Sequence, residues 1–153
     1  MKHKSKTAVR LVYAHTFFVD VVGLSDPVLP VKSQVNEIKT LNNLISSCKT
    51  FKETKKNARL ILSTGDGMSI NFLQGPELPF ILAIELHNKL NAYNKGKVPE
   101  EMLKVRIGMN EGPVYVMDDV EGKQSICGPG VILARRVMEL GYRVTSNFFS
   151  SSP

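Results

Sequence analysis

A polar turn, Thr64-Gly65-Asp66-Gly67, joins two apolar segments at residues 59–63 and 68–73. An Asp-Gly pair in a short connection between two such segments is a strong signal for a β-hairpin. A hairpin fixes two neighbouring strands of a sheet, so the rest of the chain has to be arranged around it. We therefore predict an antiparallel sheet that contains these two strands.

The segments around the hairpin extend this pattern. Residues 13–22 are rich in β-branched and aromatic residues and predict a strand, whereas apolar residues at helical spacing predict a helix over residues 31–48. A second helix follows Gly75-Pro76. Its expected apolar face consists of Phe80, Ile81, Ala83, Ile84, Leu86, His87 and Leu90.

The remaining predicted elements are strands at 103–109 and 113–117, a third helix at 131–140 and a final strand at 142–149. The core order is therefore strand, helix, two strands, helix, strand. This βαββαβ order is that of a ferredoxin-like α+β fold, in which helices pack on one face of an antiparallel sheet.

The length of 153 residues corresponds to one domain. We expect a basic N-terminal tail at 1–12, the domain at 13–149 and a disordered tail at 150–153. No apolar run approaches the ~20 residues of a transmembrane helix. The two cysteines form no disulfide framework, so a reducing, cytoplasmic setting is the default expectation.

The formal net charge is +6, and two basic runs, at residues 2–6 and 49–59, carry much of it. We favour a solvated tail and a solvated helix end over a surface that attracts polyanions. No zinc pattern and no aromatic-rich strand accompanies these charges, so we do not expect nucleic acid as a partner. A basic nucleic-acid-binding domain stays an alternative that rests on the net charge alone.

Two acidic residues interrupt the apolar strands. Asp20 lies near the end of the first predicted strand and Asp66 lies in the hairpin turn. In the predicted topology these strands are neighbours, so the two carboxylates meet and repel each other. A divalent cation would relieve this repulsion, because hard cations prefer oxygen ligands. An ordinary Asp-Gly turn with no metal is the alternative.

Four segments together resemble the motifs of the class III nucleotidyl cyclases, the adenylate and guanylate cyclase family. The segments are FVDVVGL (18–24), TGDGM (64–68), VRIGMNEGPVYV (105–116) and GPGVILARRVMELG (128–141), and they occur in the order of that family. Each is weak alone, whereas four in order are fairly specific. The resemblance runs from about residue 17 to residue 141.

This resemblance implies the cyclisation of a nucleoside triphosphate, in which the ribose 3′-hydroxyl attacks the α-phosphate and pyrophosphate leaves. It implies two Mg²⁺ or Mn²⁺ ions held by Asp20, Asp66 and the backbone carbonyl of Val21. Backbone amides of Gly23, Leu24 and Ser25 would hold the triphosphate.

The resemblance further implies a homodimer with shared active sites. One chain supplies the metal aspartates and the other supplies Arg136, which would stabilise charge on the α-phosphate in the transition state. Arg106, in contrast, is expected to pair with a nearby acid rather than to bind substrate.

Several positions depart from the family pattern. Ile132 stands where the family has the Asn that positions the ribose. Leu62 and Ser125 stand where the family reads the base with Lys and with Asp or Thr, so the base stays open. The segment after the third predicted helix is short compared with the family. An alternative is therefore a cyclase-fold module that binds nucleotide or dimerises without efficient turnover.

Overall fold

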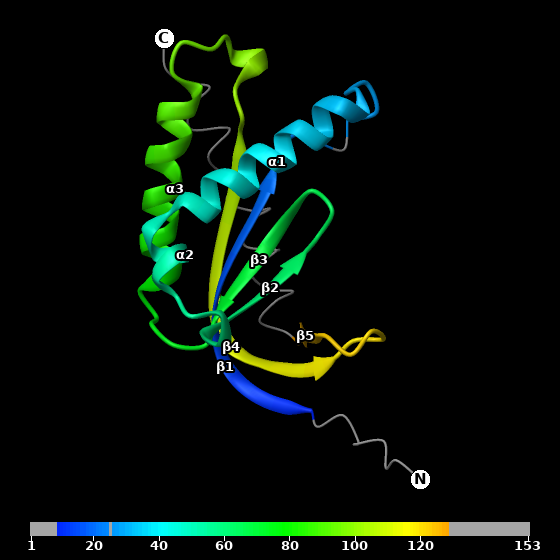
Figure 1. Ribbon diagram of the computed structural model, residues 1–153, viewed down its shortest axis with the longest axis vertical. Coiled ribbons are helices and arrows are strands. Elements are labelled where there is room, and N and C mark those ends of the chain that lie inside the picture. The colour runs from blue at the N-terminus through cyan, green and yellow to red at the C-terminus, as the bar shows by residue number, and fades with distance from the viewer. Residues whose placement is uncertain (1–8, 25, 129–153) are drawn as a thin grey trace.

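The computed structural model describes residues 9–24 and 26–128. Over this part of the chain, five strands form one antiparallel sheet in the order β2-β3-β1-β4-β5 (Figure 1). The strands are β1 (Arg10–Val21), β2 (Arg59–Ser63), β3 (Gly67–Phe72), β4 (Val105–Asp118) and β5 (Gln124–Cys127). The helices are α1 (Val31–Ser47), α2 (Lys49–Glu53) and α3 (Leu78–Asn94), with 3-10 turns at Lys56–Ala58 and Pro99–Glu101.

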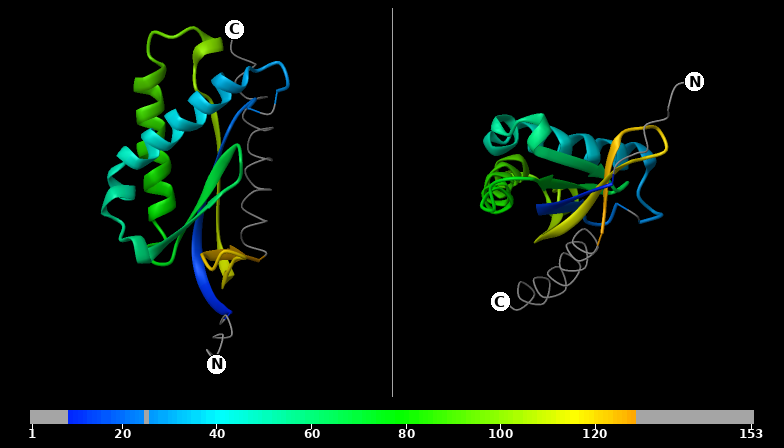
Figure 2. Two further views of the ribbon diagram at one scale, coloured as in Figure 1. Left: turned by 45° about the vertical axis from the view of Figure 1, so that its right-hand side comes forward. Right: turned by 90° about the horizontal axis from the view of Figure 1, so that it is seen from below.

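The three α-helices lie on one face of the sheet (Figure 2). Successive residues of a strand point to opposite faces, so alternate residues of β1 and β3 form the floor on which the helices pack. This floor and the helices enclose the main core, whose fully buried side chains include Phe17, Val19, Leu41, Ile45, Ile70, Phe72, Leu82 and Leu86. The structure confirms the predicted α+β fold, because β1 to β4 have the ferredoxin-like order.

The opposite face of the sheet carries a smaller apolar cluster and a polar network. Ala14, Val114 and Ile126 form the buried centre of the cluster. Farther along the same face, the Thr16 hydroxyl donates to the Asn71 side-chain oxygen at 2.8 Å. The Asn71 amide donates to the Ser69 hydroxyl and to a backbone carbonyl of β2. This polar network therefore links the three neighbouring strands β1, β3 and β2.

The long strand β4 differs from the prediction, which divided it into two strands around Gly112. The structure has one continuous strand, Val105–Asp118, paired with β1 along twelve positions. Pro113 is tolerated because β5 pairs only with Tyr115–Asp118. At Pro113, β4 is therefore an edge strand on the β5 side, where the missing N–H breaks no ladder bond.

Three further features differ from the prediction: the start of β1, the presence of β5 and the buried face of α3. β1 begins at Arg10, opposite Val116, so residues 10–12 belong to the sheet and not to a tail. β5 lies between the strand predicted at 113–117 and the helix predicted at 131–140, where no element was expected. On α3, the buried residues are Pro79, Leu82, Leu86 and Leu90. The predicted apolar face was thus wrong for Phe80, Ile81, Ile84 and His87, which are exposed.

The predicted tail residues 1–8, the third helix at 131–140, the strand at 142–149 and the tail at 150–153 lie outside the described residues. Among the helices of residues 9–24 and 26–128, none has the length and apolar character needed to cross a bilayer.

Candidate functional site

The register of β1 and β3 brings the two predicted metal-ligand segments together. Asp20 lies opposite Gly67, the residue that follows Asp66. Beyond the end of the ladder, the Val21 backbone N–H donates to the Asp66 carbonyl oxygen at 2.8 Å. The backbones that carry Asp20 and Asp66 are thus direct neighbours, as the sequence predicted.

Gly67 makes this close approach of the two strands feasible. A Cβ atom added at Gly67 would lie 1.9 Å from the Val19 carbonyl oxygen and 2.6 Å from the Asp20 Cα. Both atoms belong to the backbone of β1, so they cannot move aside as a flexible side chain would. Any other residue at position 67 would force β3 away from β1 at the point where the carboxylates are carried.

Asp20 is engaged by Arg106 of β4, which lies directly opposite it in the β1–β4 ladder. The Arg106 Nε donates to Asp20 Oδ1 at 2.9 Å, and Nη2 donates to Oδ2 at 2.6 Å. The Asp20 side chain is 4% exposed, whereas that of Arg106 is 26% exposed. The expectation that Arg106 pairs with an acid is confirmed, and the acid is the predicted metal ligand.

Asp66 has a more open environment than Asp20. It is half-buried, and the Thr64 hydroxyl donates to its Oδ1 at 3.5 Å. In the part of the chain that the structure describes, no group of three or more His, Cys, Asp and Glu side chains is placed to hold a metal ion. The candidate donor set is therefore the two carboxylates with the Val21 carbonyl. These hard oxygen donors have the chemistry that fits Mg²⁺ or Mn²⁺.

The segment predicted to hold phosphates follows β1 directly. Gly23 has a φ of 77°, and its carbonyl accepts a hydrogen bond from the Asp26 N–H at 3.1 Å. Leu24 is buried in the main core, and Ser25 lies outside the described residues. A turn at this position is a natural use of glycine, which adopts positive φ without steric cost.

A hollow of about 300 Å³ adjoins this turn and the β2–β3 hairpin that carries Asp66. Leu24 and Gly65 line one side of it, and α1 contributes Gln34 and Lys39 together with two apolar residues. The hollow thus brings one cationic side chain near both predicted ligand segments.

The two predicted base-pocket residues lie differently in the sheet. Leu62 packs against the cluster on the face away from the helices. Ile126 is buried in the same cluster, so its neighbour Ser125 points to the other face of β5, where it lies opposite Met117. Strand alternation thus turns the Ser125 side chain away from the Leu62 cluster, although β2 and β5 themselves are in contact. Ile132 and Arg136 lie outside the described residues.

The sequence did not identify the polar residues that share a sheet face with Asp20. By strand alternation, Thr16, Ser69 and Asn71 lie on that face, and all three are buried. The available signal was the alternation in β3, where Ser69 and Asn71 interrupt an otherwise apolar strand. Such spacing places both polar side chains on one face.

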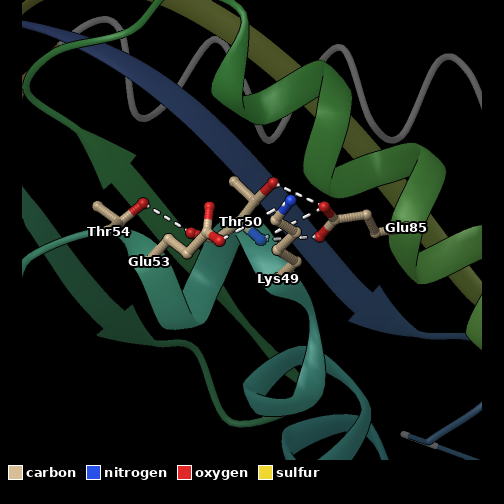
Figure 3. Close-up of polar contacts among 5 residues, drawn as sticks. All are labelled: Lys49, Thr50, Glu53, Thr54 and Glu85. Carbon is tan, nitrogen blue, oxygen red and sulfur yellow. Dashed lines mark hydrogen bonds and ion pairs between the residues drawn. The ribbon is translucent and has the colours of Figure 1, made fainter.

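A second hollow, of about 650 Å³, lies between α2 and α3, away from these motifs. At its wall, the Glu85 carboxylate accepts hydrogen bonds from the Thr50 N–H at 3.0 Å and the Thr50 hydroxyl at 2.9 Å (Figure 3). Lys49 and Glu53 form a surface pair at 3.9 Å. Because these polar groups bond with one another, the contact joins the two helices.

Solved structures of adenylyl and guanylyl cyclases share this fold. A bacterial light-regulated adenylyl cyclase is 18% identical over 86% of this chain and 71% of its own, with a TM-score of 0.69. A non-canonical dimeric guanylyl cyclase domain of the RhoGC fusion protein from the fungus Blastocladiella emersonii is 18% identical over 87% of this chain and 77% of its own, with a TM-score of 0.65. An adenylate/guanylate cyclase/hydrolase from Silicibacter pomeroyi is 19% identical over 87% and 73%, also at 0.65.

Neither a protein-family model nor a curated protein sequence matches the chain. At this level of identity the structural matches establish the fold. The chain thus has the fold of the nucleotidyl cyclase catalytic domains, in agreement with the resemblance of its four motifs.

Proposed function

We propose that this protein is a nucleotidyl cyclase, which converts a nucleoside triphosphate to a 3′,5′-cyclic nucleotide and pyrophosphate. The observation that carries the proposal is the juxtaposition of Asp20 and Asp66 at one end of the β1–β3 pair. It occurs in a fold shared with adenylyl and guanylyl cyclases.

Asp20, Asp66 and the Val21 carbonyl are the groups that would hold Mg²⁺ or Mn²⁺. Such ions lower the pKa of a bound hydroxyl and neutralise charge on phosphate oxygens. The reaction forms a bond between the ribose O3′ and the α-phosphorus and breaks the bond to the β-phosphate oxygen, with the 3′-hydroxyl proton released. The two aspartates are held near each other because Asp20 lies on β1 and Asp66 lies in the turn that leads into the neighbouring strand β3.

The triphosphate would extend from the metal ligands toward Gly23, Leu24 and Ser25. Support comes from the position of Gly23 and Leu24 directly after β1 and from the adjoining hollow with Lys39. Successive backbone amides in a turn are suitable donors to phosphate oxygens. Lys39 adds a positive charge at the rim.

We further propose that two copies of the chain complete each site, with Arg136 of one copy at the α-phosphate held by the other. A surface of exposed apolar side chains supports self-association. It consists of Leu11, Tyr13, Tyr115 and Met117, on neighbouring positions of β1 and β4. A similarly folded guanylyl cyclase domain has been solved both as a non-canonical dimer and as a monomer, so self-association of this fold occurs, while the arrangement of the two copies is part of the proposal.

The base is the part of the substrate that these residues define least. Leu62 offers an apolar contact in place of a charged donor, and Ser125 offers at most a hydroxyl. An apolar pocket discriminates weakly between ligands, because no buried polar partner is left unpaired by the wrong one. We therefore expect these two positions to give loose base selectivity, with any sharp preference set elsewhere.

Incubation of the purified chain with ATP, GTP, CTP and UTP in the presence of Mn²⁺ tests the proposal. Mass spectrometry of the products is expected to detect a cyclic nucleotide from at least one triphosphate, together with pyrophosphate. Binding of a triphosphate without any cyclic product would favour a nucleotide-binding module of the same fold instead.

A further inference from the structure

We propose that Arg106 is the resident counter-ion of Asp20 and that it competes with a divalent cation for this carboxylate. Arg106 thereby sets the affinity of the site for metal. The inference rests on the proposed function for the metal, whereas the ion pair itself is independent of it. Arg106 is then a positioning residue that acts through Asp20.

The geometry of the pair leads to this inference. Both carboxylate oxygens of Asp20 accept a hydrogen bond from the one guanidinium group, at 2.9 and 2.6 Å. Such a bidentate ion pair holds a carboxylate in a single orientation. An ion that approaches Asp20 therefore meets oxygens that already have a cationic donor.

The difference in burial indicates which partner moves. The Asp20 side chain is 4% exposed and is carried by a strand that is paired on both sides. The Arg106 side chain is 26% exposed and is longer, so it reaches the surface. A cation would displace Arg106 toward solvent while Asp20 stays in place.

Charge makes the two partners exclusive. A guanidinium and a divalent cation on the same buried carboxylate repel each other, and this repulsion is strong where water is scarce. Without either cation, Asp20 would be a buried and unpaired charge, which is costly. Arg106 therefore stabilises the metal-free protein and weakens the binding of metal by a linked amount.

The first test measures Mn²⁺ binding to the full chain by electron paramagnetic resonance, with no nucleotide present. Arg106→Gln is expected to tighten Mn²⁺ binding by ~10-fold or more, because it removes the competing charge. Arg106→Lys keeps the positive charge but cannot bond both carboxylate oxygens of Asp20 at once. Its affinity for Mn²⁺ is therefore expected to lie between those of Arg106→Gln and the wild type. Lys104→Gln is the matched control, since it removes one exposed positive charge nearby and should leave binding unchanged.

Equal or weaker Mn²⁺ binding by Arg106→Gln would overturn the inference, because it would mean that Arg106 does not compete. Tighter binding by Lys104→Gln to the same extent would also overturn it, since net charge alone would then explain the effect.

The second test is a double-mutant cycle of Asp20→Asn and Arg106→Gln in metal-free buffer, read by urea denaturation. Non-additive losses of stability are expected, because each single change leaves the other partner unsatisfied. Additive losses would overturn the ion pair regardless of any cyclase activity. Tightened Mn²⁺ binding in a chain that makes no cyclic nucleotide would support the inference and contradict only the proposed function.

Discussion

Asp20 is a buried carboxylate whose surroundings are set by two residues from different strands. Arg106 supplies the opposite charge, and Gly67 lets β3 lie against β1. Neither residue was assigned to the metal site by the sequence. The position of the carboxylate thus depends on a close backbone contact that only glycine permits.

Replacement of Gly67 by alanine is expected to destabilise the protein by about 3 kcal/mol or more, because the added methyl overlaps backbone atoms of β1. Gly112→Ala is the matched control in another strand. A Cβ there meets only the Asn110 side-chain nitrogen, at 4.0 Å, so the change should cost less than about 1 kcal/mol. Urea denaturation measures both free energies of unfolding. Similar losses for the two variants would contradict the steric explanation.

Among the elements, the short helix α2 depends on a side chain from α3. Its N-cap residue, Cys48, makes no side-chain cap, and Glu85 accepts the Thr50 N–H instead (Figure 3). This bond satisfies a donor that a helix N-terminus leaves without an intrahelical partner. Burial raises the pKa of the Cys48 thiol, and the nearby Glu85 charge raises it further.

Glu85→Gln is expected to lower the free energy of unfolding by about 1–2 kcal/mol, because a charged acceptor becomes a neutral one. It should also lower the pKa of Cys48 toward its ordinary value, which thiolate absorbance measures in a Cys127→Ser background. The Cys48 thiol has a higher pKa in the folded state than in the unfolded state. Its contribution to the free energy of unfolding is therefore complete below the unfolded-state pKa and is lost as pH rises through the folded-state pKa. Glu85→Gln should therefore reduce the loss of stability at alkaline pH.

Glu53→Gln provides the control for this prediction. Glu53 borders the same hollow but only pairs with Lys49 on the surface, so the change should cost less than about 0.5 kcal/mol. An equal effect of the two glutamate changes would show that the cap is unimportant.

The sequence predicted the elements with strong local signals and missed those set by tertiary pairing. The Asp-Gly turn predicted the β2–β3 hairpin and the apolar periodicity predicted α1, because turn chemistry and residue spacing are local properties of the sequence. Gly112 and Pro113 indicated a break in β4, yet pairing with β1 continues through both. On α3, apolar residues occur on several sides, so periodicity alone chose the wrong face.

The candidate site shows the same division. Asp20 and Asp66 were predicted as neighbours because strand order alone brings them together. The bond between Asp20 and Arg106 depends on the β1–β4 register, which no local pattern specifies. Strand alternation likewise turns the Ser125 side chain to the other face of β5 from the cluster that contains Leu62, and the role of both residues at the base stays a prediction.

At the scale of the whole molecule, the proposed site requires two chains. The helices cover one face of the sheet, while the outer ends of β1 and β4 extend past them (Figure 1). These ends carry the exposed apolar surface of Leu11, Tyr13, Tyr115 and Met117. Burial of this surface between two copies would be favourable in proportion to the apolar area removed from water.

Mixing Asp20→Ala chains with Arg136→Ala chains tests the shared site. Each homodimer should be inactive, whereas a mixed dimer should regain one intact site and up to half of the wild-type rate per dimer. Tandem affinity purification of differently tagged chains isolates the mixed dimer before the assay. Absence of activity in such purified mixed dimers would contradict a site built from two chains.

The central claim is that a carboxylate pair at the end of β1 and β3 performs nucleotide cyclisation, and Asp66 gives the most direct measurement. The initial rate of cyclic nucleotide formation with Mn²⁺ should fall by ~10²-fold or more in Asp66→Asn, because loss of a metal ligand removes several kcal/mol of transition-state stabilisation. The exposed Asp118→Asn should keep the wild-type rate. An Asp66→Asn protein that cyclises its substrate as fast as the wild type would contradict the account.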